Sequence, residues 1–174
     1  MSDRIVFEGI RFNVHEIDVP TADGSPIKRH VARHPGAVVI APLLDNDRVV
    51  LIQNTRATVG KTLMELPAGT REPNEAAEVT AARELIEETG YRAGKLTRAL
   101  QFYASPGITD ELMHLFIAED LTEGDHAREA GEAIVNRITT WAEIDAMIDR
   151  GEFEDGKTLT GLLWVRRWLD RQNR

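Results

Sequence analysis

Three glutamates and an arginine in the middle of the chain have the residue types and the spacing for metal chemistry. On an α-helix, Glu84, Glu87 and Glu88 share one face, and Arg83 lies four residues before Glu87, where it can pair with that carboxylate. Carboxylates on one stripe repel each other, and a hard divalent cation such as magnesium would relieve this repulsion by taking them as oxygen ligands. The alternative is a solvated acidic face, because a like-charge pair at this spacing costs only about 0.2–0.5 kcal/mol.

The neighbouring residues extend this cluster into a longer pattern. A glycine is followed by five residues and a glutamate, then by seven residues and Arg-Glu, an apolar residue, any residue, Glu-Glu, any residue and a glycine. All seven fixed positions are filled, by Gly69, Glu75, Arg83, Glu84, Glu87, Glu88 and Gly90. Leu85 also fits, whereas Tyr91 stands where an aliphatic residue is usual. The pattern resembles the Nudix box of the Nudix hydrolases, in which the two glycines shape the loops and the first glutamate is structural.

This resemblance implies a role for each residue of the cluster. In Nudix hydrolases the box forms a loop, a helix and a second loop that together hold the metal ions. By resemblance, Glu84 and Glu88 are the main metal ligands, Glu87 is a further ligand, and the backbone carbonyl of Ala68 joins them. Arg83 would orient the carboxylates without binding the metal itself. The implied cofactor is Mg²⁺, two or three ions per site, with Mn²⁺ as the alternative.

The chain is also similar to one subfamily, the ADP-ribose pyrophosphatases. Pro106, sixteen residues beyond the last glycine of the box, matches the marker proline of this subfamily. Arg56 matches an arginine that contacts the substrate phosphate, and Glu65 lies in the segment that leads into the box, near the metals. Arg29, in the N-terminal region, is a further candidate for substrate binding. The implied substrate is ADP-ribose or a related nucleoside diphosphate sugar, and another nucleotide sugar such as GDP-mannose is the alternative.

The resemblance implies a hydrolytic mechanism. Magnesium would bridge the diphosphate and activate a water for in-line attack on phosphorus, which gives AMP and ribose 5-phosphate. Arg56 would neutralise the developing charge. The general base of this subfamily is a glutamate on a late loop, and the acidic stretch 123–132 matches that place. Glu132 is the preferred candidate, ahead of Glu129, although both could instead be solvated acids of an ordinary loop.

The helices that would position these residues follow from periodicity and from helix-end signals. We expect helices over 73–89, 141–150 and 157–171. The first would have a proline in its first turn and Gly90 just past its end. On the side opposite the glutamates it carries Val79, Ala82 and Ile86, which we expect to seat it in the core.

The strands are expected from apolar runs between turn signals. We expect strands over 5–19, 27–33, 37–43, 48–53, 62–66, 96–102, 112–118 and 134–139. A turn is expected at 21–24, and 37–43 should pair with 48–53 as a hairpin. The predicted fold class is α/β: a Nudix-like α/β/α sandwich with a mixed sheet, plus an N-terminal β-hairpin region.

Composition limits the organisation and the partners. A chain of 174 residues with 42% hydrophobic content suits one domain with a small appendage, divided here into an N-terminal strand region, 1–36, and a Nudix domain, 37–174. The absence of cysteine excludes disulfides and thiolate sites, and no apolar run has the length of a membrane span, so a cytoplasmic enzyme is expected. A net charge of −8 argues against nucleic acid as a partner. The subfamily resemblance implies a homodimer in which the N-terminal strands help to build the partner's site.

Two other patterns in the sequence have competing interpretations, and the histidines show no pattern. The stretch 151–158 matches a phosphate-binding loop literally, but it follows a predicted helix and is acidic, so we expect a turn between two helices. A Nudix fold could also bind a nucleotide without cleaving it, although all the box glutamates are present. The five histidines are scattered and show no zinc-binding spacing.

Overall fold

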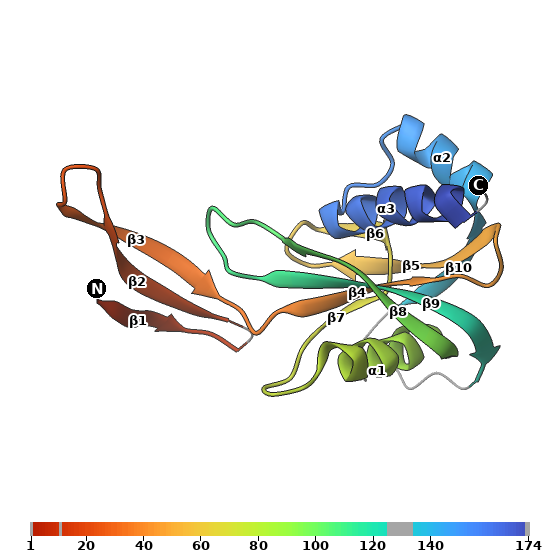
Figure 1. Cartoon of the computed structure of the whole chain (residues 1–174), viewed down its shortest axis with the longest axis horizontal. Coiled ribbons are helices and arrows are strands. Elements are labelled where there is room, and N and C mark those ends of the chain that lie inside the picture. The colour runs from red at the N-terminus through yellow and green to blue at the C-terminus, as the bar shows by residue number, and fades with distance from the viewer. Residues whose placement is uncertain (1, 11, 125–133, 173–174) are drawn as a thin grey trace.

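A computed structural model describes residues 2–10, 12–124 and 134–172 (Figure 1). The elements in chain order are β1 (Asp3–Glu8), β2 (Asn13–Pro20), β3 (Pro26–Arg33), β4 (Ala37–Pro42), β5 (Arg48–Arg56), β6 (Lys61–Glu65), β7 (Ala68–Thr70), α1 (Ala77–Thr89), β8 (Tyr91–Tyr103), β9 (Leu112–Glu123), β10 (Val135–Thr140), α2 (Trp141–Asp149) and α3 (Gly156–Gln172). The two C-terminal helices lie close to their predicted bounds. No helix in the described part of the chain is long and apolar enough to cross a membrane.

The predicted α/β/α sandwich is confirmed. α1 covers one side of the central strands, and α2 and α3 cover the other (Figure 1). Side chains alternate along a strand, so β4 contributes to the cores on both sides of the sheet. Val38 shares a core cluster with Leu85 of α1. Val39 shares the other cluster with Ile144 of α2 and Leu162 of α3. β4 is buried along its whole length, which explains its continuous apolar sequence.

The central strands form two sheets. β7, β4, β9 and β8 form a mixed sheet in that order, in which β4 and β9 are parallel. β10, β5 and β6 form an antiparallel sheet. The hairpin expected from 37–43 and 48–53 is therefore wrong, because the two strands belong to different sheets. They are linked by an isolated bridge between Leu43 and Val49 and by a hydrogen bond from the Leu44 N–H to the Arg48 carbonyl. β4 pairs with β9 over six positions, and β5 pairs with β10 over six positions. These long pairings with distant strands replace the expected pairing of β4 with β5.

The N-terminal region is a three-stranded antiparallel sheet, not the hairpin expected from the sequence, because 5–19 divides into β1 and β2. The predicted turn at 21–24 is present, with Gly24 at φ 85° and its N–H bonded to the Thr21 carbonyl. This sheet projects away from the sandwich (Figure 1). Its last strand contacts the β8–β9 loop, where Arg33 pairs with Asp110 at 2.9 Å.

α1 begins later than predicted, at Ala77 and not at Pro73. The residues before it form a tight turn instead: the Glu75 N–H bonds to the Glu72 carbonyl, and Asn74 has φ 65°. Proline and asparagine suit the second and third positions of a turn that needs a positive φ. The other end is as expected, with Gly90 in the left-handed conformation at φ 78°.

The core-facing side of α1 also differs from the prediction. Val79 is 57% exposed and Ala82 is exposed, so the expectation that they seat the helix is wrong, whereas Ile86 is half-buried. The helix instead buries Ala77, Ala81 and Leu85, which are spaced by four residues. The glutamate stripe thus borders the buried face and does not lie opposite to it. The acidic side chains are carried to the junction between the helix and the sheet, where backbone atoms of β7 are within their reach.

Candidate active site

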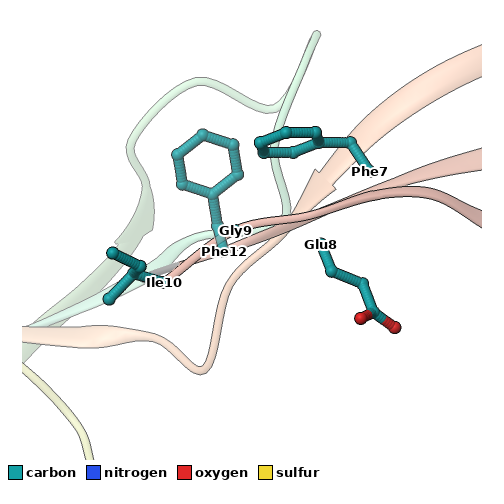
Figure 2. A pocket seen from close by; sticks show the side chains of 5 residues that line it. All are labelled: Phe7, Glu8, Gly9, Ile10 and Phe12. Carbon is teal, nitrogen blue, oxygen red and sulfur yellow. The ribbon is translucent and has the colours of Figure 1, made fainter.

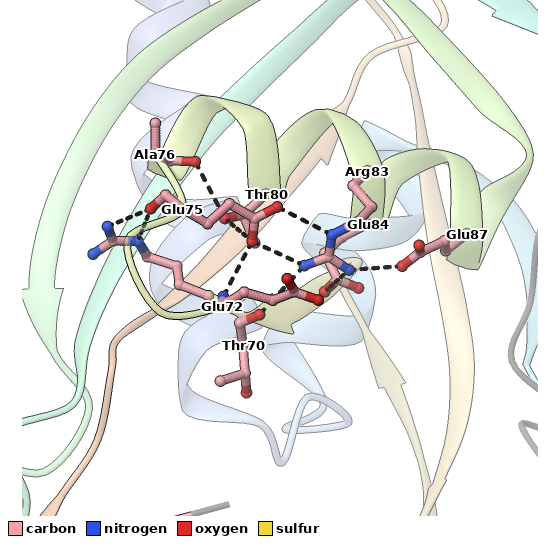
Figure 3. Close-up of polar contacts among 9 residues, drawn as sticks. Thr70, Glu72, Glu75, Ala76, Thr80, Arg83, Glu84 and Glu87 are labelled. Carbon is pink, nitrogen blue, oxygen red and sulfur yellow. Dashed lines mark hydrogen bonds and ion pairs between the residues drawn. The ribbon is translucent and has the colours of Figure 1, made fainter.

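Arg83 is the centre of the polar contacts around the box helix (Figure 3). Its Nη1 donates to Glu84 Oε1 and to Glu87 Oε2, both at 2.8 Å, and its Nη2 donates to Glu75 Oε2 at 3.2 Å. The pair with Glu87 is the one that the spacing predicted. These bonds, first of all those to Glu75, raise the pKa of Arg83. The guanidinium therefore stays charged and holds three carboxylates in fixed directions.

Glu75 ties the turn before α1 to the helix itself. Its Oε2 accepts from the Glu72 N–H at 3.1 Å and from Thr80 Oγ1 at 2.9 Å, in addition to Arg83 (Figure 3). The hydrogen bond from Arg83 is the largest cause that lowers the pKa of Glu75 from 4.5 to about 2. This geometry agrees with the structural role that the box resemblance implies for this residue.

The lack of a side chain at Gly69 is required by Glu84. A Cβ placed on Gly69 would lie 1.9 Å from Glu84 Cδ, which is far inside van der Waals contact. Any other residue at this position would displace the carboxylate. The glycine thus lets Glu84 lie directly against β7.

Glu88 lies on the inner edge of the helix, with 5% of its surface exposed. The Ala68 N–H donates to its Oε2 at 2.8 Å. This bond joins the end of α1 to the start of β7, next to the glycine that Glu84 covers. The structure thus brings together the loop before the box and the two predicted main ligands.

This set of atoms fits a hard divalent cation by its chemistry. Glu84, Glu87, Glu88 and the Ala68 carbonyl offer only oxygen, which Mg²⁺ prefers. Within the described residues, no group of three acidic or histidine side chains has already converged on one point as a metal site. Arg83 holds Glu84 and Glu87 while Glu88 is turned toward Ala68, so the carboxylates are gathered on one junction but occupied by protein donors.

A second charged cluster lies just upstream of the box. The Glu65 side chain is 1% exposed and accepts from Arg56 Nε at 2.8 Å and from Arg56 Nη2 at 2.6 Å. Lys157 at the start of α3 donates to the same Glu65 Oε2 at 2.6 Å. The hydrogen bond to Glu65 raises the pKa of Arg56, with a smaller contribution from the charge of Glu88. Arg56 therefore lies within electrostatic reach of the box helix.

Sequence reasoning did not select Lys157 as a site residue. It belongs to the stretch 151–158, which joins α2 to α3 as the helix-to-helix turn that was expected. Its neighbour Thr158 accepts the Leu66 N–H through Oγ1 at 2.9 Å, so the start of α3 contacts the segment leading into the box. In the sequence Lys157 is the lysine of a literal phosphate-binding-loop pattern, which does not identify Glu65 as its partner.

The remaining predicted residues are not placed at the box helix. Pro106 is exposed in the β8–β9 loop, which contacts β3, and Arg29 is exposed in β3 of the N-terminal sheet. Glu129 and Glu132 lie outside the described residues. The assignments of Pro106, Arg29, Glu129 and Glu132 stay predictions.

The comparisons with known proteins agree with this geometry. A NUDIX domain profile matches residues 32–162. The chain is 35% identical over 162 residues to an ADP-ribose pyrophosphatase of Bacillus subtilis, covering 92% of this chain and 88% of that protein. The chain belongs to the Nudix hydrolase family, in its ADP-ribose pyrophosphatase subfamily. Nudix hydrolases generally use divalent metal ions, which agrees with the oxygen donors on α1 of this Nudix hydrolase.

Two further relatives extend the comparison. The Nudix hydrolase described here is 33% identical over 174 residues to a GDP-mannose pyrophosphatase of Escherichia coli O1:K1, covering 91% of this chain and 90% of that protein. A crystal structure of an ADP compounds hydrolase superposes with a TM-score of 0.84 at 24% identity, covering all of this chain and 95% of the other. The structural likeness confirms the fold, and the relatives define a group of nucleotide-cleaving enzymes.

Proposed function

We propose that this Nudix hydrolase cleaves the diphosphate of ADP-ribose to give AMP and ribose 5-phosphate. The observation that supports it most directly is the complete box, in which Arg83 holds Glu84 and Glu87 while Glu88 lies against Ala68. The names of the Bacillus subtilis and Escherichia coli relatives point to nucleoside diphosphate sugars. GDP-mannose or another nucleotide sugar is the alternative substrate.

The proposed metal ligands are Glu84, Glu87, Glu88 and the carbonyl of Ala68. We assign them Mg²⁺, two or three ions per site, with Mn²⁺ as the alternative. Such ions, when bound, supply positive charge to the diphosphate and make a bound water more acidic. A protein with a net charge of −8 needs this positive charge to accept an anionic substrate.

The chain's own residues then divide the remaining work. Arg83 orients the carboxylates of Glu84 and Glu87 through hydrogen bonds. Arg56 is proposed to bind a phosphate oxygen and to stabilise the charge that develops on it. Glu132, or Glu129 as second choice, is the proposed general base that takes a proton from the attacking water.

We also propose a cytoplasmic homodimer assembled through the N-terminal region, 1–36. Phe7, Ile10 and Phe12 are exposed around the β1–β2 connection, with the Glu8 side chain directed away from them (Figure 2). Apolar groups clustered on a projecting sheet are typical of a surface that another chain covers. In such a dimer Arg29 would contribute to the partner's site, and Pro106 would lie in a substrate loop.

The proposed activity is tested with a panel of nucleotide sugars in the presence of magnesium, scored by phosphate release after coupling to a phosphatase. We expect ADP-ribose to give the highest kcat/KM, with GDP-mannose and ADP-mannose lower. Tight binding of ADP-ribose without product over long incubation would instead indicate a nucleotide-binding module. A higher kcat/KM for GDP-mannose would move the assignment to the alternative substrate.

A further inference from the structure

Glu65 has more positive partners than one carboxylate needs. Its side chain is 1% exposed, so the charged form requires compensation inside the protein. Arg56 already satisfies it with two hydrogen bonds from Nε and Nη2. Lys157, with 17% of its side chain exposed, donates to Oε2 as well, and its ammonium also lies 2.9 Å from Asp155. A structural explanation of the pair between Arg56 and Glu65 does not require this lysine.

Under the proposed function, the positive charge of Arg56 has two partners, the Glu65 carboxylate and the substrate phosphate. Arg56 holds a buried anion, and it is the cation proposed to bind the substrate phosphate. If Glu65 had no other partner, drawing Arg56 toward the substrate would leave a buried carboxylate uncompensated, which is strongly unfavourable. With Lys157 on the same carboxylate, that penalty is smaller. The Arg56 side chain is 34% exposed, and its guanidinium has further N–H donors beyond the two that Glu65 uses.

We propose that Lys157 is a positioning residue for substrate binding: by neutralising Glu65, it leaves the charge of Arg56 available to the diphosphate. This inference rests on the proposed function. It predicts that Lys157 acts on affinity for the diphosphate through Arg56, without contact to the substrate.

The local structure holds Lys157 in place for this role. Asp155 accepts from the Thr158 N–H at 3.0 Å at the start of α3 and lies 2.9 Å from Lys157 Nζ. Thr158 Oγ1 accepts the N–H of Leu66, the residue that follows Glu65. The lysine is therefore attached to a helix end that is itself bonded to the Glu65 segment. These bonds fix the backbone of Lys157 beside the Glu65 segment, and the pair with Asp155 restrains its ammonium.

The test is substrate binding by the Lys157→Met variant of the full chain. The probe is the α,β-methylene analogue of ADP-ribose, measured by titration calorimetry with magnesium present. We expect the Kd to rise about tenfold, which corresponds to the loss of one charge-assisted contact. KM for ADP-ribose should rise similarly, and kcat should fall as well, because Arg56 is also proposed to stabilise the charge that develops on the phosphate. Lys157→Arg should keep most of the affinity.

Two further variants separate this role from a merely structural one. Lys95→Met removes the same charge from a surface pair with Glu119 on β8 and β9, and should bind the analogue like wild type. Glu65→Gln combined with Lys157→Met removes the buried anion together with its second cation. This double variant should recover the affinity to within about threefold of wild type, because a neutral glutamine no longer retains the charge of Arg56.

Several results would overturn the inference. One is a folded Lys157→Met protein with wild-type affinity, and another is a double variant that binds no better than the single one. If Lys157→Met does not fold by circular dichroism, the double variant decides alone: near-wild-type affinity supports the inference and weak binding overturns it. A wild-type protein that neither binds the analogue nor cleaves ADP-ribose would refute the proposed function first, and the inference with it.

Discussion

At the scale of single residues, the box depends on contacts that leave no room for substitution. Arg83 is shared by three carboxylates, and Gly69 is covered by one of them. The carboxylates are therefore held by donors of the protein itself. Gly69 has no functional group of its own, but its lack of a side chain fixes the position of the proposed ligand Glu84.

Gly69→Ala should disable metal binding. The new Cβ would lie 1.9 Å from Glu84 Cδ, so the carboxylate must move away from β7. We expect magnesium affinity and kcat/KM to fall at least tenfold, by analogy with the loss of groups that orient metal ligands. Gly156→Ala is the control, because a Cβ there meets nothing within 4 Å. Equal magnesium affinity in the two variants, by calorimetry, would contradict this account of Gly69.

Glu75→Gln should change how stability depends on pH. In the folded protein the pKa of Glu75 is lowered from 4.5 to about 2, so the carboxylate stabilises the fold above pH 4.5 and loses this effect as pH falls toward 2. The free energy of unfolding should therefore differ most between wild type and variant near pH 7, and the difference should shrink between pH 5 and pH 2. Urea unfolding in metal-free buffer measures it. A difference that is constant with pH would show that Arg83 does not act on this carboxylate.

Glu132→Gln should lower turnover by about 10²–10⁴-fold while magnesium affinity is kept, because a general base acts on the proton and not on the metal ligands. The measurement is kcat for ADP-ribose beside magnesium titration. Glu129→Gln is the matched variant, and it should retain most of the activity. If the two variants exchange these results, Glu129 is the base; if both are active, neither is.

At the scale of elements, the site lies where α1 meets β7 and where α3 meets the end of β6. Glu88 bonds to the Ala68 N–H across the first junction, and Thr158 bonds to the Leu66 N–H across the second. The segment leading into the box is thus held from both layers of the sandwich. Its geometry depends on helices that are separated from it in sequence.

Thr158→Val should loosen the second junction. Valine has nearly the shape of threonine but no hydroxyl, so the buried Leu66 N–H loses its acceptor at a cost of about 1–3 kcal/mol. We expect a Tm lower by several degrees and weaker substrate binding, measured by scanning calorimetry and by KM. Thr160→Val on the same helix is the control for the loss of a hydroxyl. Unchanged Tm and KM for Thr158→Val would show that α3 does not support the box segment.

At the scale of the whole molecule, the apolar side chains of the sandwich are buried, whereas several apolar side chains of the N-terminal sheet are exposed to solvent. The sandwich buries two apolar clusters, one against α1 and one against α2 and α3. Phe7 and Phe12 remain exposed on the projecting sheet. The proposed homodimer rests on this contrast between a buried core and exposed apolar side chains on the N-terminal sheet.

Ile10→Asp together with Phe12→Asp should convert the proposed dimer into monomers, because charges in a covered apolar surface are costly. Light scattering should give twice the 19.5 kDa of the chain for wild type and a single chain mass for the variant. Leu163→Asp, an exposed apolar position on α3, should leave the mass unchanged. A wild-type protein that is monomeric at micromolar concentration would refute the proposed dimer.

The sequence by itself determined the features that depend on local spacing. The box positions, the end of the helix at Gly90 and the pair of Arg83 with Glu87 all follow from residues within a few turns of each other. The fold class could also be predicted, because the order of the predicted strands and helices along the chain indicates it. The function followed from the box in the same way, as a resemblance.

Only the tertiary structure decided which distant parts meet. The parallel pairing of β4 with β9, the face of α1 that is buried and the contact of Lys157 with Glu65, across 92 positions, are not visible in local patterns. The physical reason is that strand pairing and helix seating are chosen by how all apolar surfaces are covered together. A periodic segment shows that it has a buried face, but its partners elsewhere in the fold choose that face.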